Sequence, residues 1–338
     1  MARVRRGVVR ERHVRGRGQG IREGVQHGLG DRRLRRAQLL PAGTARARPQ
    51  AGSGQATDEP LQPHHRAVDR RTGAGPVRAV PLHPPQHALP RTTDRVTTVR
   101  FFGSGDSFGD GGRFQACILV EHDGFHVLLD CGASSLTAMK RTGFDPNAID
   151  AVVVTHFHGD HSGGIPYLIL DGQFRKRERA LLIAGPARIR ERMAAIFEAA
   201  LPTSSTTRQS FDVTYAELGE RPFRVGPAVV VALPVAHLAA TTPHGIRVTL
   251  GGKTIGYTGD TDWCEALPRL ADGADLFIAE AYSFEKRIPQ HLSHATLLAH
   301  RDELRAKRIV LTHPGVETLA RRSELAWELA DDGLVIEL

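Results

Sequence analysis

The chain has 338 residues, of which 41% are hydrophobic and 24% are charged, and its formal net charge is +8. This is enough apolar material for a buried core. A membrane-spanning helix is not predicted, because the sequence has no run of about 18 apolar residues. A secretory signal is not predicted, because no apolar stretch follows the basic start. The three cysteines are widely spaced, which argues against a disulfide framework and favours a cytosolic protein.

Residues 1–95 differ in composition from the rest of the chain. They hold 20 arginines, no lysine, seven acidic residues and no Phe, Trp or Tyr, so their net charge is +13; residues 96–338 hold 25 basic and 30 acidic residues, a net of −5. A segment with so little apolar surface cannot offset its chain entropy, so we expect a disordered extension. An arginine-rich arm would suit nucleic-acid binding. The lack of lysine favours another interpretation, a mis-annotated start with the real protein beginning near Val96.

From residue 96 onward, short strands alternate with helices. Strands are expected at 99–103, 115–121 and 125–132, the last two joined by a tight Asp123-Gly124 turn. The pattern then predicts helices at 133–143, from His161, 186–200, 264–271, 293–305 and 317–330, and strands at 150–154, 180–184, 211–217, 223–225, 228–235, 247–250, 254–258, 275–280, 308–312 and 333–337. Hairpins mixed with βα units predict one α/β domain over 96–338, with two sheets covered by helices.

A dense group of histidines follows the buried strand at 150–154. Residues 155–161 read THFHGDH and place His156, His158, Asp160 and His161 within six positions. Imidazole nitrogens and carboxylates are the ligands that zinc prefers, with iron and manganese as alternatives. A lone histidine is usually a packing or surface residue, but this density predicts a metal site.

Three more ligand-type side chains follow apolar strands. His237 closes VVVALPVA, Asp260 lies in YTGDTD at 257–262, and His313 lies in LTHPG at 311–315. The end of a strand in a rigid sheet can aim such a side chain at a site. His244 is the alternative to His237, and we favour His237 because it directly ends its strand.

The motif THFHGDH resembles the HxHxDH signature of the metallo-β-lactamase superfamily, and the segments at 257–262 and 311–315 extend the resemblance through 96–338. The resemblance implies a four-layer αββα sandwich with two divalent metal ions, zinc being favoured over manganese or iron. Carried over by position, it implies that one ion is held by His156, His158 and His237, that the second is held by Asp160, His161 and His313, and that Asp260 bridges the two.

Further segments resemble one branch of this superfamily. Asp260 stands where zinc β-lactamases typically have cysteine, which disfavours antibiotic hydrolysis. Residues 101–121, FFGSGDSFGDGGRFQACILVE, resemble the glycine-rich first strand and turn of ribonuclease Z and of phosphonate-pathway phosphodiesterases. FIAEAYSF at 277–284 and HLSHATL at 291–297 resemble the HEAT element and the catalytic-histidine segment of ribonuclease Z. This mapping implies that Glu280 orients His291, which would protonate a leaving group; alternatively, Glu280 and His291 only cap a strand and a helix.

The predicted activity is hydrolysis of a small-molecule or short nucleotide phosphodiester. Two adjacent metal ions activate a bridging hydroxide at neutral pH, and we expect Asp160, His291 and Glu280 to take part in catalysis. Authentic tRNA 3′ processing is disfavoured, because Ala279 replaces the HEAT histidine and only 22 residues separate His237 from Asp260, too few for the ribonuclease Z arm.

Other functions stay open as alternatives. They are a ribonuclease Z-like endonuclease, a lactone or thioester hydrolase, and a di-iron redox protein, the last disfavoured because the sequence shows no flavin-binding segment. A nucleic-acid partner is not favoured, no membrane partner is expected, and a homodimer is compatible with the resemblance. Trp263 and Phe284 fit either the rim of the site or the core.

Overall fold

Two seven-stranded sheets pack face to face in residues 96–338, the part of the chain that this computed structural model describes. The predictions for residues 1–95 lie outside the described residues. The first sheet has the order β14 (Val335–Glu337), β1 (Thr98–Gly103), β2 (Cys117–His122), β3 (Phe125–Leu129), β4 (Ala151–Val153), β5 (Leu181–Gly185) and β6 (Val213–Glu217). The second has the order β13 (Glu328–Leu329), β12 (Ile309–Thr312), β11 (Leu276–Glu280), β10 (Lys253–Tyr257), β9 (His244–Leu250), β8 (Ala228–Pro234) and β7 (Phe223–Val225).

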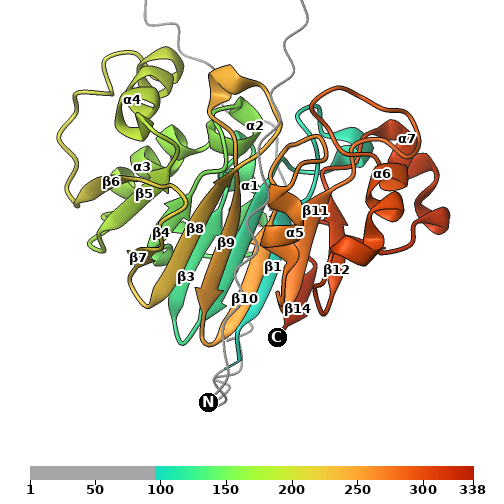
Figure 1. The fold of residues 1–338 in the computed structure, drawn as a ribbon. Coiled ribbons are helices and arrows are strands. Elements are labelled where there is room, and N and C mark those ends of the chain that lie inside the picture. Colours follow the sequence, from blue (N-terminus) through green and yellow to red (C-terminus); the bar gives the residue numbers. More distant parts are fainter. Residues whose placement is uncertain (1–95) are drawn as a thin grey trace, which may run out of the picture. The chain divides into compact units, whose positions relative to one another are not determined.

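Helices cover the outer faces of both sheets (Figure 1). The connections between strands β3 to β6 of the first sheet contain α1 (Ser135–Arg141), α2 (Gly159–Ser162), α3 (Ile165–Phe174) and α4 (Ile189–Ala200). The second is covered by α5 (Ala266–Ala271), α6 (His294–Ala299) and α7 (Val316–Ala320). Short 3-10 turns complete the connections: η1 (Asp110–Gly112), η2 (Pro146–Ala148), η3 (Ala239–Thr241), η4 (Arg301–Glu303) and η5 (Arg322–Glu324). The predicted αββα layering is confirmed.

Strands buried on both faces explain the continuous apolar runs of the sequence. In β3, Val127 and Leu129 enter the core between the two sheets, whereas Leu128 enters the core under the helices. In β4, Val153 and Val152 divide in the same way. Successive side chains of a strand point to opposite faces, so a strand between two cores must be apolar at every position. This is why three valines precede the histidine loop.

The predicted helix over 317–330 is wrong beyond its first turn. α7 ends at Ala320, and η5 and the strand β13 follow it. β13 pairs in parallel with β12, with Leu311 opposite Leu329, and Leu329 is buried. Sheet pairing and burial therefore override the helical spacing. The predicted helix over 293–305 is likewise shorter, since α6 ends at Ala299 and η4 follows.

Parallel pairing brings the carboxyl ends of several strands to one edge of the sandwich. β3 and β4 run in parallel, and so do β10, β11 and β12. The residues that follow β4, β10 and β12 include the histidine loop, Asp260 and His313. The ligand-type side chains of the two sheets are thereby gathered at one edge.

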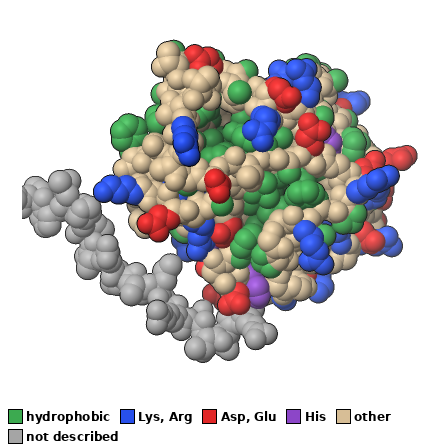
Figure 2. Space-filling view, turned by 90° about the vertical axis from the view of Figure 1, so that its left-hand side faces the viewer, with side chains coloured by type: hydrophobic (Ala, Val, Ile, Leu, Met, Phe, Trp, Pro, Cys, Tyr) green, Lys and Arg blue, Asp and Glu red, His purple; other side chains and the backbone are tan. Residues whose placement is uncertain are grey.

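The side of the domain that carries α3 and α4 shows hydrophobic, basic and acidic side chains side by side (Figure 2). Phe174, at the end of α3, is 80% exposed. Among the described residues, none of the helices combines the length and the apolarity needed to span a bilayer.

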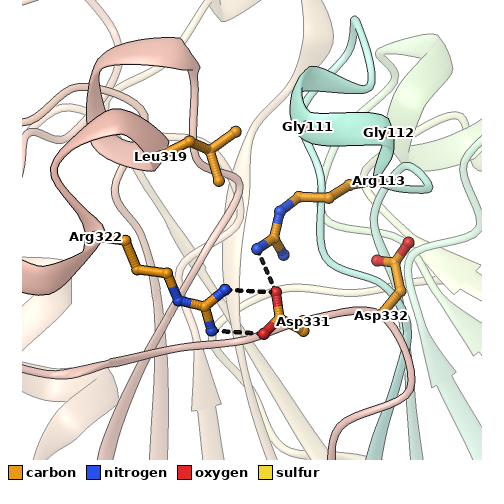
Figure 3. A pocket seen from close by; sticks show the side chains of 7 residues that line it. All are labelled: Gly111, Gly112, Arg113, Leu319, Arg322, Asp331 and Asp332. Carbon is orange, nitrogen blue, oxygen red and sulfur yellow. Dashed lines mark hydrogen bonds and ion pairs between the residues drawn. The ribbon is translucent and has the colours of Figure 1, made fainter.

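A polar clamp ties the glycine-rich loop at 104–114 to the C-terminal segment (Figure 3). Asp332 accepts hydrogen bonds from the backbone N–H of Ser104 at 2.9 Å and of Phe114 at 2.8 Å, so one carboxylate closes both ends of the loop. Arg113 pairs with Asp331 at 2.5 Å, and Arg322 pairs with the same carboxylate. The loop is therefore fixed to the body of the domain at its base.

We expect Asp332→Ala to lower the free energy of unfolding of the full chain by about 1–3 kcal/mol, because two partly buried amides lose their acceptor. Urea unfolding followed by circular dichroism measures this change. Asp302→Ala is the control, since the Asp302 side chain is 94% exposed and, within residues 96–338, pairs only with exposed Arg301; its effect should stay within about 0.5 kcal/mol. Equal effects of the two variants would show that Asp332 is not a clamp.

Candidate metal centre

The first group of converging side chains comprises His156, His158, His237 and Asp260. His156 Nε2 lies 3.0 Å from His158 Nδ1, and His237 Nε2 lies 3.2 Å from the same atom. His156 Nε2 is 3.8 Å from Asp260 Oδ2. His237 Nδ1 is 2.9 Å from the carbonyl oxygen of Gln290, which fixes the proton on Nδ1 and leaves Nε2 free as an acceptor.

The second group comprises Asp160, His161, His313 and again Asp260, all buried. Asp160 Oδ2 lies 3.3 Å from His161 Nε2 and 3.3 Å from His313 Nε2. Asp260 Oδ1 lies 3.1 Å from His161 Nε2 and 3.4 Å from His313 Nε2. Asp260 is the residue common to both groups, as expected for a side chain between two ions.

A buried carboxylate supports the histidine loop from below. Asp130, directly after β3, accepts from the backbone N–H of Thr155 at 2.8 Å and lies 2.7 Å from His161 Nδ1. Thr155 Oγ1 is 3.0 Å from His156 Nδ1. These contacts orient the two rings so that each Nε2 faces the centre. Asp130 and His313 have φ values of 57° and 56°, in the left-handed region that is uncommon for non-glycine residues and that aspartate and histidine enter more often than most.

The donor set fits divalent metal ions. In a tetrahedral zinc site, metal–nitrogen bonds of about 2.0–2.1 Å place neighbouring ligand atoms roughly 3.3 Å apart, close to the spacings observed here. Burial, foremost, holds the pKa of His156, His158 and His237 below the usual value, so these rings stay neutral and offer lone pairs. Among the described residues, none makes a hydrogen bond of good geometry with the buried Asp260 Oδ1, although His161 and His313 lie close to this atom. These are the properties of a ligand set.

The carboxylates of the second group require positive charge. Burial alone would raise the pKa of Asp260, but His161 and His313 hold it well below its usual range. Burial would lower the pKa of His313, but Asp260 and Asp160 raise it to about 9. Buried carboxylates without compensating charge are strongly disfavoured, and a pair of divalent cations would supply that charge directly.

Glu280 and His291 form a pair beside these two groups, and together with Asp260 and His313 they make a third set of side chains that could hold a metal ion. Glu280, the last residue of β11, is fully buried and accepts from the backbone N–H of Thr261. Its other carboxylate oxygen lies 3.0 Å from His291 Nδ1. The His291 ring lies 5.1 Å from that of His237 and 6.1 Å from that of His313, measured between centroids. The structure thus places these two residues together at the centre, where a catalytic pair is expected.

His237 lies in the first ligand group, whereas its alternative, His244, does not. His244 begins β9, and its Nδ1 lies 2.9 Å from the carbonyl oxygen of Thr242; it belongs to neither group. The aromatic residues Trp263 and Phe284 are packing residues here: Trp263 stacks on His300, and Phe284 is buried.

Four supporting residues were not found from the sequence: Asp130, Thr155, Gln290 and Tyr282. Asp130 had one visible signal, since an acidic residue ends the apolar run HVLLD. Thr155 is the first residue of the motif, but its hydroxyl is not one of the side-chain types from which the metal site was predicted. Gln290 acts through its backbone carbonyl, which no sequence pattern reveals. Tyr282 lies with its ring 4.9 Å from that of His291.

We expect His237→Ala to reduce the bound metal from about two ions to about one per chain, because one converging group loses a ligand. His244→Ala, a histidine on the same stretch but outside both groups, should keep the full metal content. Elemental analysis of the purified full-length variants measures both. The opposite result, with metal lost only in His244→Ala, would reverse the choice between the two histidines.

Comparison with known proteins agrees with this geometry. The family described as anti-Pycsar protein Apyc1 matches residues 97–326. A ribonuclease Z from Methanosarcina acetivorans is 27% identical over 302 residues, covering 71% of this chain and 97% of the relative. A ribonuclease Z from Thermococcus kodakarensis is 31% identical over 231 residues, covering 54% and 72%.

Solved structures share the fold. The metallo-β-lactamase fold protein YhfI from Bacillus subtilis has a TM-score of 0.61 and 23% identity, covering 72% of this chain and all of that one. The resemblance seen in the histidine motif is confirmed by these matches. The chain belongs to the family described as anti-Pycsar protein Apyc1, within the ribonuclease Z and phosphodiesterase-like branch of the metallo-β-lactamase-fold hydrolases.

Proposed function

We propose that this protein is a metal-dependent phosphodiesterase with two divalent ions, for which zinc is the expected metal. The observation that carries the proposal is the convergence of seven ligand-type side chains from both sheets, with a Glu280–His291 pair beside them. The proposed ligands are His156, His158 and His237 for one ion, Asp160, His161 and His313 for the other, and Asp260 between them. When bound, two such ions supply an activated water and neutralise charge on the phosphoryl oxygens.

Asp160 is the proposed acceptor of a proton from the attacking water. Burial would raise its pKa, but His161 and His313 hold it below the usual range, so the carboxylate stays ionised. Its Oδ2 atom faces both rings at 3.3 Å. The side chain can therefore orient a water molecule as well as contact a metal ion.

His291 is the proposed donor of a proton to the leaving oxygen. Burial lowers its pKa, but the hydrogen bond with Glu280 and the charge of that carboxylate raise it above the usual value overall. His291 Nδ1 faces Glu280, so Nε2 is the nitrogen available to the substrate. A ring that is half-buried and held by a fully buried carboxylate is suited to this role.

A small substrate is favoured over tRNA. The segment between His237 and Asp260 is taken up by η3, β9 and β10, and these elements belong to the domain itself. The residues of 96–338 also carry a net negative charge, which does not favour a nucleic-acid backbone. A ribonuclease Z-like activity is the second candidate, because similar proteins are named ribonuclease Z. We also propose that the protein acts in the cytosol.

The activity is tested on the full chain with bis(p-nitrophenyl) phosphate. We expect cleavage that falls by about 10²-fold or more in Asp260→Ala, because the electrostatic stabilisation that two ions provide is lost. Asp262→Ala is the control, since Asp262 pairs with exposed Arg287 and belongs to neither group; its rate should stay within about 2-fold of wild type. Two bound iron ions without cleavage would instead support the di-iron redox alternative.

We expect His291→Ala to lower kcat by about 10²–10⁴-fold while the metal content stays unchanged. His291 acts when protonated, and Glu280 holds its pKa above the usual value, so wild-type activity should persist below that pKa and fall as the pH rises through it. The variant should lack this alkaline limb. His300→Ala, a histidine that stacks on Trp263 away from the centre, is the control. Loss of metal in His291→Ala would make this residue a ligand, contrary to the proposal.

A further inference from the structure

The glycine-rich loop at 104–114 lies along the edge of the second metal group. At its start, the carbonyl oxygen of Ser104 accepts a hydrogen bond from the His313 backbone N–H at 2.9 Å. At its end, the Gln115 side chain donates to the carbonyl oxygen of Ser107 at 3.0 Å. Gln115 packs closely on Gly132, and a Cβ on Gly132 would also meet the carbonyl oxygen of Asp160. The loop therefore extends from His313 to the backbone of Asp160.

The loop is braced from within and from below. Asp106, which is fully buried, accepts from the backbone N–H of Phe108 at 3.3 Å and of Asp110 at 3.0 Å. Asp332 closes the base, as described above. A braced loop holds whatever its tip carries in a constant position.

The tip of this loop carries an exposed aromatic ring. Phe108 is 81% exposed, the most exposed large hydrophobic side chain of residues 96–338. Within that range, no aromatic or cationic partner contacts its ring. Such a ring offers a planar apolar face that a ligand ring can contact, and the loop that presents it begins at Ser104, which is bonded to His313.

A second ring faces the same edge from the other sheet. The Tyr282 ring, two residues after β11, lies 4.9 Å from that of His291 and 6.2 Å from that of His313. It rests on Gly315, where a Cβ would come within 3.1 Å of the ring, and the Gly315 backbone N–H donates to the Tyr282 carbonyl oxygen at 2.8 Å. Gly315 thus permits this close approach.

Tyr282 contacts the helix that packs beside the loop carrying Phe108, since its carbonyl oxygen accepts a hydrogen bond from Thr318 Oγ1 of α7 at 3.2 Å. Burial raises the pKa of Tyr282, and the charges of Asp106 and Asp110 raise it further. α7 also packs beside η1, with Leu319 against Gly111. The two aromatic residues therefore stand at the same edge of the centre.

We propose that Phe108 and Tyr282 form an aromatic platform that selects phosphodiesters whose leaving group contains a planar ring. This inference rests on the proposed phosphodiesterase function. Tyr282 is next to His291, the proposed proton donor to the leaving oxygen, so a ring on that oxygen would meet Tyr282 first. Aromatic rings stack or meet edge to face with gains beyond simple burial. The platform would act on substrate binding and leave the proton transfer to His291.

The test compares two diesters on the full chain with its metal ions. Methyl phenyl phosphate and methyl hexafluoroisopropyl phosphate both yield methyl phosphate, and their leaving alcohols have similar acidity, so they differ mainly in the planar ring. Phosphorus NMR measures kcat and KM for each. We expect wild type to prefer the phenyl ester about 10-fold or more in kcat/KM, and Phe108→Ala and Tyr282→Ala each to reduce that preference about 3- to 10-fold, mainly through KM.

Two controls separate the platform from other roles. Tyr282→Phe keeps the ring and should keep the preference. Phe174→Ala removes a ring that is 80% exposed, nearly as exposed as Phe108, at the end of α3, and should also keep it. Metal content and the circular dichroism spectrum of each variant show that the site and the fold are retained.

The possible outcomes distinguish this inference from the proposed function. Cleavage of both esters with no preference, or with a preference that neither alanine variant changes, overturns the platform and leaves the phosphodiesterase intact. Equal loss on both esters in Tyr282→Ala also overturns it, since Tyr282 would then act on His291. No cleavage of either ester or of bis(p-nitrophenyl) phosphate overturns the phosphodiesterase and the platform together.

Discussion

The architecture depends on one buried carboxylate. Asp260 follows β10 of the second sheet and lies 3.1 Å from His161, which follows β4 of the first sheet. It also approaches His156 and His313, so side chains from both sheets meet around it. A carboxylate in such surroundings is stable only where positive charge reaches it. The negative charge of Asp260 is balanced only when the carboxyl edges of the two sheets lie together. The packing of the sheets and the chemistry of the centre therefore depend on the same contact.

Much of the fold could be predicted because it follows from local sequence patterns. Apolar runs such as VVV at 152–154 require a strand between two cores, and the Asp123-Gly124 turn fixes the hairpin of β2 and β3. The end of the chain was not predictable in this way. Residues 317–330 have helical spacing, but β13 forms there because β12 offers an open edge. Such pairing depends on a distant strand, which local patterns do not contain.

The site residues could be predicted where several ligand-type side chains stand close together in the sequence. They could not be predicted where a residue contributes through its backbone. His156, His158, Asp160 and His161 stand in one motif, and the structure brings them together. The choice of His237 over His244 depended on where a strand ends, and the structure places His237 at the centre. Asp130, Gln290 and Tyr282 carried no comparable signal, because their positions follow from a left-handed turn, a carbonyl oxygen and a close contact with glycine.

The first and last strands of the described domain are neighbours, and this affects how the protein is made. β1 pairs with β14, with Thr98 opposite Glu337, so one edge of β1 stays open until residues 335–337 have left the ribosome. Contacts between such distant segments are slow to form, and an open strand edge invites wrong pairing. The loop that carries Phe108 is likewise closed only after Asp332 has been synthesised. A partly synthesised chain would therefore carry its histidine motif well before β14 can pair with β1 and Asp332 can close the loop.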